Sequence, residues 1–236
     1  MRVLAVGANP DDVELLCAGT LAKYTERGDT VAIAYLTQGD KGSRTLLPEK
    51  IADIRRFEAE EAARLINSDL FSLGIPDGEV VPTLAFRRRV VEIIRRTTPD
   101  IIITHHSDDY MSDHINTSKL VKEASFWAGS AQFAGDPGEA PSVIKRPQIF
   151  YMDTVCGIGF CPQSYVDITS VMDMKIEMLS KHKSQINYMK ERDGLDFLEA
   201  MITAARYRGH QCGVKYAEGF IPERVYPSLS PMRLLP

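Results

Sequence analysis

The chain lacks the features that mark several protein classes. Its 236 residues carry a formal net charge of −4, so no excess of Lys and Arg indicates nucleic-acid binding. No apolar run approaches the roughly 20 residues that a membrane span requires. The short run "VLAVGA" is followed at once by acids, unlike the apolar region of a signal peptide. We therefore expect a cytoplasmic protein with no nucleic-acid and no membrane partner.

Cysteine is scarce, and its spacing excludes one kind of metal site. The four cysteines form no CxxC pair, which argues against a zinc–cysteine site. In a reducing compartment, we expect them to be small buried hydrophobic residues. Repeats and low-complexity tails are also absent, and 44% of the residues are hydrophobic. This composition suits a single globular domain over residues 1–236.

The hydrophobic pattern alternates between short β-rich runs and amphipathic helical segments. This alternation predicts an α/β fold with a mostly parallel, Rossmann-like sheet and helices on both faces. We expect strands within residues 2–8, 30–37, 69–80, 101–106, 148–154 and 164–169. We expect helices over residues 11–28, 48–66, 83–98, 113–128, 171–189 and 195–209.

Polar segments follow four of the predicted strands. They read "GANPDD", "TQGDKGS", "GIPDG" and "THHSDDYMSDH". In a parallel sheet, ligands bind at the carboxyl ends of the strands, so we expect these segments to meet at one site. The first of them lacks a glycine-rich phosphate cradle and places two carboxylates at the turn, which argues against nucleotide binding.

Two of these segments carry groups suited to metal and acid–base chemistry. Asp11 and Asp12 are adjacent at a strand-to-helix turn, so one carboxylate can bind a metal while the other accepts a proton. Alone, the pair also suits an ordinary helix N-terminus. His114 follows Asp113 at the start of a helix, where an acid can orient the ring. Together, the two segments predict a metal-dependent site or a remnant of one.

The chain resembles the PIG-L/LmbE family of zinc-dependent N-acetyl sugar deacetylases. "ANPDDVE" is similar to the family's first motif, AHPDDxE, and "DYMSDH" to the motif that ends in Asp-His. "LTQGDKGS", "IRRFEAEEAARL", "LGIPDG", "KHKSQ" and "RGHQCGVKYAEGF" also resemble family segments. The resemblance covers nearly the whole chain. It implies a hydrolase that removes the acetyl group from an N-acetylglucosamine-type sugar or glycoside, with family members often forming homo-oligomers.

The family's motifs imply a role for each matching residue. Asp11 would be the general base, and Asp12 and His114 would be ligands of zinc or another divalent metal, one ion per chain. Asp113 would orient or support His114 and is assigned a catalytic role with Asp11. The family's third ligand is the His of AHPDD, and Asn9 occupies that position here. Because zinc prefers nitrogen, sulfur and carboxylate ligands, we expect the metal to be weakly bound.

A second departure is Met111, where many family members have a His that stabilises the oxyanion or protonates the leaving amine. Met can do neither. His105, His106 or Asp109 could take its place, and we assign His105 and Asp109 to the substrate site on this basis.

The resemblance also implies sugar contacts for Arg55 and Asp77. A purely structural alternative exists for each, namely a helical pair of Arg55 with Glu58 and a turn position for Asp77.

Three explanations of Asn9 remain open at the level of the sequence. The chain could be an active deacetylase that tolerates Asn9 or uses another ligand such as His105. It could be a catalytically inactive family member that binds carbohydrate. Asn9 could also be an engineered substitution that traps a ligand. The intact Asp11 and Asp12 favour the deacetylase.

Overall fold

The computed structural model describes residues 1–133, 141–142, 145–224 and 235–236. All strands in these ranges join one seven-stranded sheet with the order β3-β2-β1-β4-β5-β7-β6. The first five strands along the chain are parallel, and β7 runs antiparallel to both β5 and β6. The strands are β1 (Arg2–Gly7), β2 (Thr30–Thr37), β3 (Asp69–Ile75), β4 (Ile101–Thr104), β5 (Gln148–Met152), β6 (Ser164–Asp167) and β7 (Ala217–Pro222).

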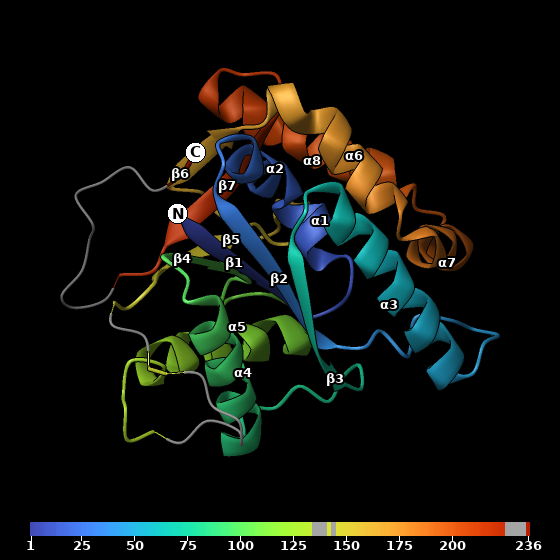
Figure 1. Cartoon of the computed structure of the whole chain (residues 1–236). Coiled ribbons are helices and arrows are strands. Elements are labelled where there is room, and N and C mark those ends of the chain that lie inside the picture. The colour runs from blue at the N-terminus through green and yellow to red at the C-terminus, as the bar shows by residue number, and fades with distance from the viewer. Residues whose placement is uncertain (134–140, 143–144, 225–234) are drawn as a thin grey trace.

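Helices cover both faces of the sheet, as Figure 1 shows, so the predicted architecture is confirmed. One layer consists of α4 (Leu84–Thr97) and α5 (Ser112–Trp127). The other layer consists of α1 (Asp12–Leu16), α2 (Ala18–Glu26), α3 (Pro48–Leu65), α6 (Met172–Ser180), α7 (Lys183–Asp193) and α8 (Phe197–Cys212). Two short 3₁₀ helices, η1 (Val155–Gly157) and η2 (Thr169–Val171), flank β6.

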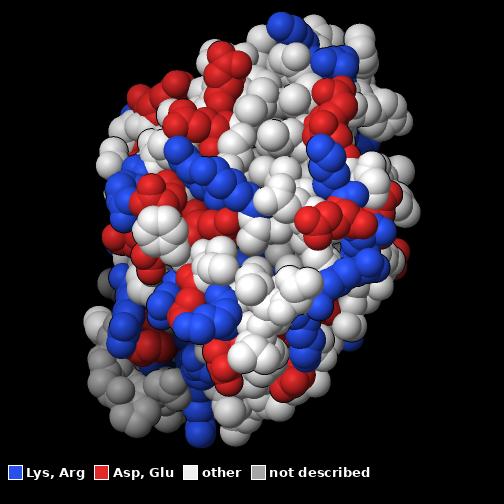
Figure 2. All heavy atoms as spheres, turned by 90° about the vertical axis from the view of Figure 1, so that its right-hand side faces the viewer, with Lys and Arg blue, Asp and Glu red and all other residues white. Residues whose placement is uncertain are grey.

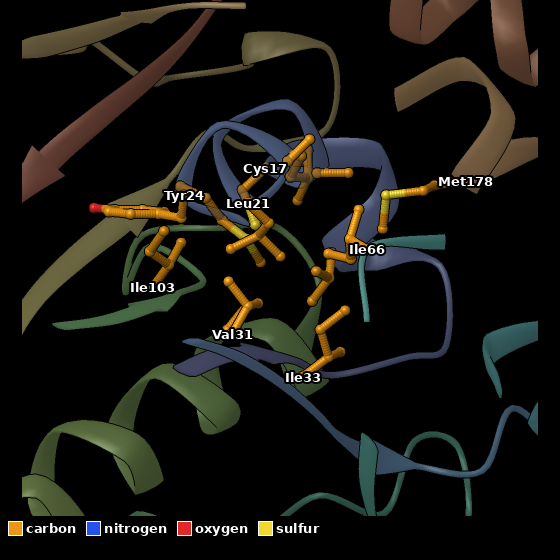
Figure 3. Close-up of a cluster of buried hydrophobic side chains, with 14 of the residues drawn as sticks. Cys17, Leu21, Tyr24, Val31, Ile33, Ile66, Ile103 and Met178 are labelled. Carbon is orange, nitrogen blue, oxygen red and sulfur yellow. The ribbon is translucent and has the colours of Figure 1, made fainter. Parts of the chain in front are cut away.

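The core has two parts because successive strand residues point to opposite faces of the sheet. In β1, Val3 and Ala5 pack into the larger cluster, whereas Leu4 and Val6 pack toward α4 and α5. Figure 3 shows the larger cluster, where Leu21 and Tyr24 of α2 lie over the sheet beside Val31 and Ile103. Packing on both faces holds the strands in place, and with them the polar segments that follow their carboxyl ends.

Two predicted helices are each divided in the structure. Residues 11–28 form α1 and α2, which are separated at Cys17 because its backbone is not helical (φ −144°, ψ 9°). Helix α2 lies close to the residue before η2, since a Cβ on Gly19 would lie 2.8 Å from Ile168. Residues 171–189 form α6 and part of α7, which are separated at the non-helical His182. That break leaves the His182 side chain buried beside Glu14.

Strand β7 was not predicted. It contains Glu218, Gly219 and Pro222, which are poor strand formers. The strand forms because Glu218 is buried and its carboxylate accepts hydrogen bonds from the amides of Gly19 and Thr20, at 2.9 and 2.7 Å. A tertiary contact therefore overrides the local propensity.

The cysteines only partly follow the prediction. Cys17 is fully buried in the core, but Cys156, Cys161 and Cys212 are exposed, and all four are free thiols. The prediction of burial is wrong for these three because they lie in η1, in the turn before β6 and at the end of α8.

The surface shown in Figure 2 is the face that carries α3 and α7. Lys and Arg side chains lie among Asp and Glu side chains there, around a central uncharged area. Among the residues that the structure describes, every helix is too short or too polar to cross a lipid bilayer.

Candidate active site and metal centre

A cavity of about 420 Å³ opens where the parallel strands end. The segments after β1, β2, β3 and β4 all contribute to its lining, which confirms the predicted convergence. The lining includes Asn9, Asp12, Gly42, Asp77, Met111 and His114. The register explains this convergence, because Val6 of β1 lies beside Ala34 of β2 and Thr104 of β4, so the strands end side by side.

Asp11 and Asp12 point to different partners, as expected for successive residues at a tight turn. Asp11 has a positive φ of 120°, a conformation that is strained for any residue except glycine and is often found at functional sites. Its Oδ1 lies 3.1 Å from Nη2 of Arg55. Asp12 instead accepts the backbone N–H of Asn9 at 2.6 Å and faces two imidazole rings. The turn thus directs the two carboxylates to different partners.

Asp12, His105 and His114 form a buried cluster suited to a metal ion. One carboxylate or ring atom from each lies within 4.8 Å of the others. Oδ2 of Asp12 is 3.1 Å from Nε2 of His105, and Oδ1 is 3.4 Å from Nε2 of His114. Nε2 of His114 is buried and has no hydrogen-bond partner. A carboxylate and imidazole nitrogens are ligands that zinc accepts, so the residues fit a divalent cation.

Asp109, rather than Asp113, orients His114. Oδ2 of Asp109 lies 3.1 Å from Nδ1 of His114, which leaves Nε2 directed at Asp12. The Asp113 carboxylate instead accepts the backbone N–H groups of Gly78 and Val80, at 2.6 and 3.4 Å. The prediction that Asp113 supports His114 is therefore wrong. Asp113 fixes the turn after β3, because the first turn of α5 directs its side chain toward that loop.

The cluster shifts the pKa values of its members strongly. Burial alone would raise the pKa of Asp12, but His114 and His105 outweigh it and hold that pKa well below its usual range. Burial opposes the charged form of His114 too, yet Asp12 and Asp109 raise its pKa to about 10. Without a metal, the proton of His114 balances the charge of Asp12. A divalent cation can take over that role if the proton leaves.

Asp11 has the protonation behaviour of a general base. Burial raises its pKa to about 7, with Arg55 opposing the rise and Asp12 adding to it. A group with this pKa is partly ionised at neutral pH and can both accept and return a proton.

Arg55 and Asp77 lie in the cavity wall. Asp77 stands in a turn, as its structural alternative expected, whereas Arg55 does not pair with Glu58. Nη1 of Arg55 is 3.9 Å from Oδ2 of Asp77, whose two oxygens accept the N–H groups of Gly39 and Lys41. Glu58 instead accepts hydrogen bonds from Ser184. Gly39 has a φ of +72°, and a Cβ there would lie 2.6 Å from Arg55. Arg55 is thus held between the turn that carries Asp11 and the loop after β2.

The residues suggested as substitutes for the missing His do not line the cavity. The side chains of His105 and Asp109 are fully buried, against Asp12 and His114 respectively. The ring of His106 meets the edges of Tyr151 and Phe160. Met111 itself lines the cavity. The cavity lining includes neither His105 nor Asp109, so their predicted role as substrate contacts gains no support from it.

The sequence motifs do not indicate the remaining wall of the cavity. Tyr188 and Met189 of α7 and Phe197 of α8 form it together with Tyr110. Aromatic residues near a cluster of polar loops are the available signal, because sugars stack on such rings, but α7 and α8 follow the site motifs by about 70 residues or more. Tertiary contacts, among them those of α7 with α3 and of α8 with α7, bring this wall to the strand ends.

Loss of the Asp109 carboxylate should weaken the metal site. We expect Asp109→Asn to lower the affinity for zinc by about 10- to 100-fold, because an outer carboxylate fixes the ring and raises its basicity. Competition with a chromophoric chelator measures this affinity. Asp108→Asn, an exposed neighbour, is the matched control. Equal affinity in Asp109→Asn and the control would contradict the assignment of Asp109.

Comparison with known proteins agrees with this geometry. The PIG-L family model, described as GlcNAc-PI de-N-acetylase, matches residues 4–125. Diacetylchitobiose deacetylase of Thermococcus kodakarensis is 28% identical over 94% of this chain and 83% of its own. The 4-oxalmesaconate hydratase of Pseudomonas putida is 26% identical over 73% of this chain and 69% of its own.

A solved structure shares the same fold. N,N'-diacetylchitobiose deacetylase from Pyrococcus horikoshii has a TM-score of 0.81 and 27% identity, covering 94% of this chain and 83% of that one. The family match extends from β1 through most of α5 and so includes both acid motifs. Because it spans just over half of the chain, the protein belongs to the PIG-L family.

Proposed function

We propose that the protein is a metal-dependent amide hydrolase that removes the N-acetyl group from an N-acetylglucosamine-type sugar or glycoside. The observation that carries the proposal is the pairing, in one cavity, of Asp11 with the Asp12–His114 centre. A deacetylase needs a proton acceptor next to a cation site, and this turn supplies both. The deacetylases among the relatives support the choice of substrate.

The cation would be zinc or a related divalent metal, one per chain, held by Asp12 and His114. When bound, it supplies Lewis acidity toward the acetyl carbonyl and lowers the pKa of a nearby water. Asp11 takes the proton from the attacking water, and Arg55 keeps its carboxylate in place. Asp109 holds the ring of His114 so that Nε2 faces the cavity side of Asp12.

Asp11 also supplies the proton for the departing amine. The family position that often holds a His is Met111, and none of His105, His106 and Asp109 lines the cavity. Asp11 has just gained a proton from the water and has a pKa of about 7, which suits its transfer to an amine. We therefore assign both proton transfers to Asp11. Arg55, Asp77 and the aromatic wall are the proposed contacts of the sugar.

Acetate release tests the proposal. The metal-free chain would be loaded with zinc and given N-acetylglucosamine and diacetylchitobiose, and both acetate and free amine would be quantified. We expect equal amounts of the two products, because amide hydrolysis releases one amine for each acetate. Sugar binding without acetate release would instead favour the alternative function, a catalytically inactive carbohydrate-binding protein. Asn9 and Met111, the two departures from the family motifs, are the reason for this alternative.

The proposal includes the setting of the reaction. We propose a cytoplasmic protein with one domain over residues 1–236 that acts as a homo-oligomer on a small N-acetylated sugar. The single sheet from Arg2 to Pro222 supports the domain assignment. Light scattering of the purified chain measures the oligomeric state.

A further inference from the structure

Asn9 occupies the position where the family has its third metal ligand, yet its side chain is turned to another partner. Its only metal-binding atom, Oδ1, accepts a hydrogen bond from Oγ1 of Thr37 at 2.9 Å. Its backbone N–H donates to Asp12. Asn9 therefore ties the turn after β1 to the end of β2, and a neutral amide oxygen is in any case a weak zinc ligand.

His105 lies beside the same carboxylate. Thr104 of β4 lies beside Val6 of β1, so the residue after β4 meets the turn after β1. Nε2 of His105 accepts the backbone N–H of Ala8 at 2.9 Å. The same nitrogen lies 3.1 Å from Oδ2 of Asp12. This position suits a third ligand, because one ligand atom each of Asp12, His105 and His114 lies within 4.8 Å of the others.

The two imidazoles are arranged as a pair around Asp12. The rings of His105 and His114 are stacked, with centroids 3.9 Å apart and planes at 21°. Nε2 of each ring lies near a different oxygen of Asp12. Nε2 of His114 is buried without a hydrogen-bond partner. Buried polar atoms are seldom left unsatisfied, so this arrangement points to a missing partner between the residues.

We infer that His105 supplies the third protein ligand of the metal and replaces the imidazole that Asn9 lacks. The ligand set is then Asp12, His105 and His114. Asn9 instead holds the turn after β1 in place through its hydrogen bond with Thr37. Binding at Nε2 of His105 exchanges the hydrogen bond from Ala8 for a bond to the metal. The inference rests on the proposed function, which places a divalent cation at this centre, and it concerns only which residues hold that cation.

Metal affinity separates the two possible third ligands. Zinc affinity would be measured by chelator competition for the unsubstituted chain, His105→Ala and Asn9→Ala. We expect His105→Ala to weaken zinc binding by at least about 100-fold. This is more than the usual effect of removing a residue that only supports a metal ligand. Asn9→Ala should weaken it far less. The opposite ranking, or unchanged affinity in His105→Ala, would overturn the inference.

Two further measurements keep the test decisive. His105→Gln replaces His105→Ala if circular dichroism shows that the latter is unfolded. The visible absorption of the Co²⁺-substituted chain should change in intensity and position in the His105 variant, because an imidazole leaves the coordination sphere. Asn9→His in the His105→Ala background should recover tight binding. An unaltered Co²⁺ spectrum in a folded His105 variant would exclude a ligand role.

The inference and the proposed function fail in different ways. Zinc binding that depends on His105, without acetate release from any N-acetylated sugar, would contradict the function alone. Acetate release by a chain whose zinc affinity is insensitive to His105 would contradict the ligand assignment alone.

Discussion

Asp11→Asn should lower the rate of N-acetyl hydrolysis by about 10²- to 10⁴-fold, the range that loss of a general base produces. The expected loss lies toward the upper end, because we assign both proton transfers to this carboxylate. Asn has nearly the same shape as Asp and can keep one hydrogen bond to Arg55, but its amide cannot accept a proton from water. The measurement is kcat for acetate release at saturating sugar and zinc.

Zinc content distinguishes this effect from damage to the metal site. The Asp11 side chain contacts Arg55 and neither His105 nor His114. Asp11→Asn should therefore bind zinc as tightly as the unsubstituted chain. Asp173→Asn, an exposed substitution in α6, is the control for the handling of variants. Activity within tenfold of the control in a zinc-loaded Asp11→Asn chain would refute the role of Asp11 as base.

Glu218→Ala should destabilise the fold by about 3–5 kcal/mol, the usual result of removing one partner from a buried ion pair. Glu218 and its partner Lys175 are both almost completely buried. The carboxylate also accepts the N–H groups of Gly19 and Thr20 and the Thr20 hydroxyl, the last at 2.5 Å. Its loss leaves a buried ammonium and two amide groups without their acceptor.

Urea unfolding followed by circular dichroism measures this free energy. Glu60→Ala is the matched control, because Glu60 is an exposed residue in the middle of α3, where such substitutions usually change stability by less than about 0.5 kcal/mol. We expect the midpoint for Glu218→Ala to fall well below that of the control. Coincident unfolding curves would show that the Glu218 network does not stabilise the junction of β7 with α2.

The parts of the fold that could be predicted follow from strong local patterns. The run Ile101–Thr104 is β-branched throughout. Helix α3 begins with Pro48 and buries Ile51 and three alanines at helical spacing. Where the prediction was wrong, long-range contacts decide the outcome. Strand β7 depends on Glu218 meeting α2, and the break between α6 and α7 depends on His182 meeting Glu14. Neither contact leaves a periodic signal in the sequence.

The candidate site likewise has features that could be predicted from the sequence and features that could not. That Asp11, Asp12 and His114 share a cavity follows from the order of parallel strands and could be predicted. The exchange of roles between Asp109 and Asp113 could not, because both acids lie within five residues of His114 and the direction of each side chain depends on where α5 begins. The position of His105 beside Asp12 depends likewise on the register of β4 against β1.

The most direct test of the account is acetate release by this chain as zinc is added to the metal-free protein. If a single cation at the Asp12–His114 centre drives hydrolysis, the rate should rise with added zinc until one ion is bound per chain. A chelator should then abolish the activity. Release at an undiminished rate by the metal-free chain, or no release by the zinc-saturated chain, would contradict the account.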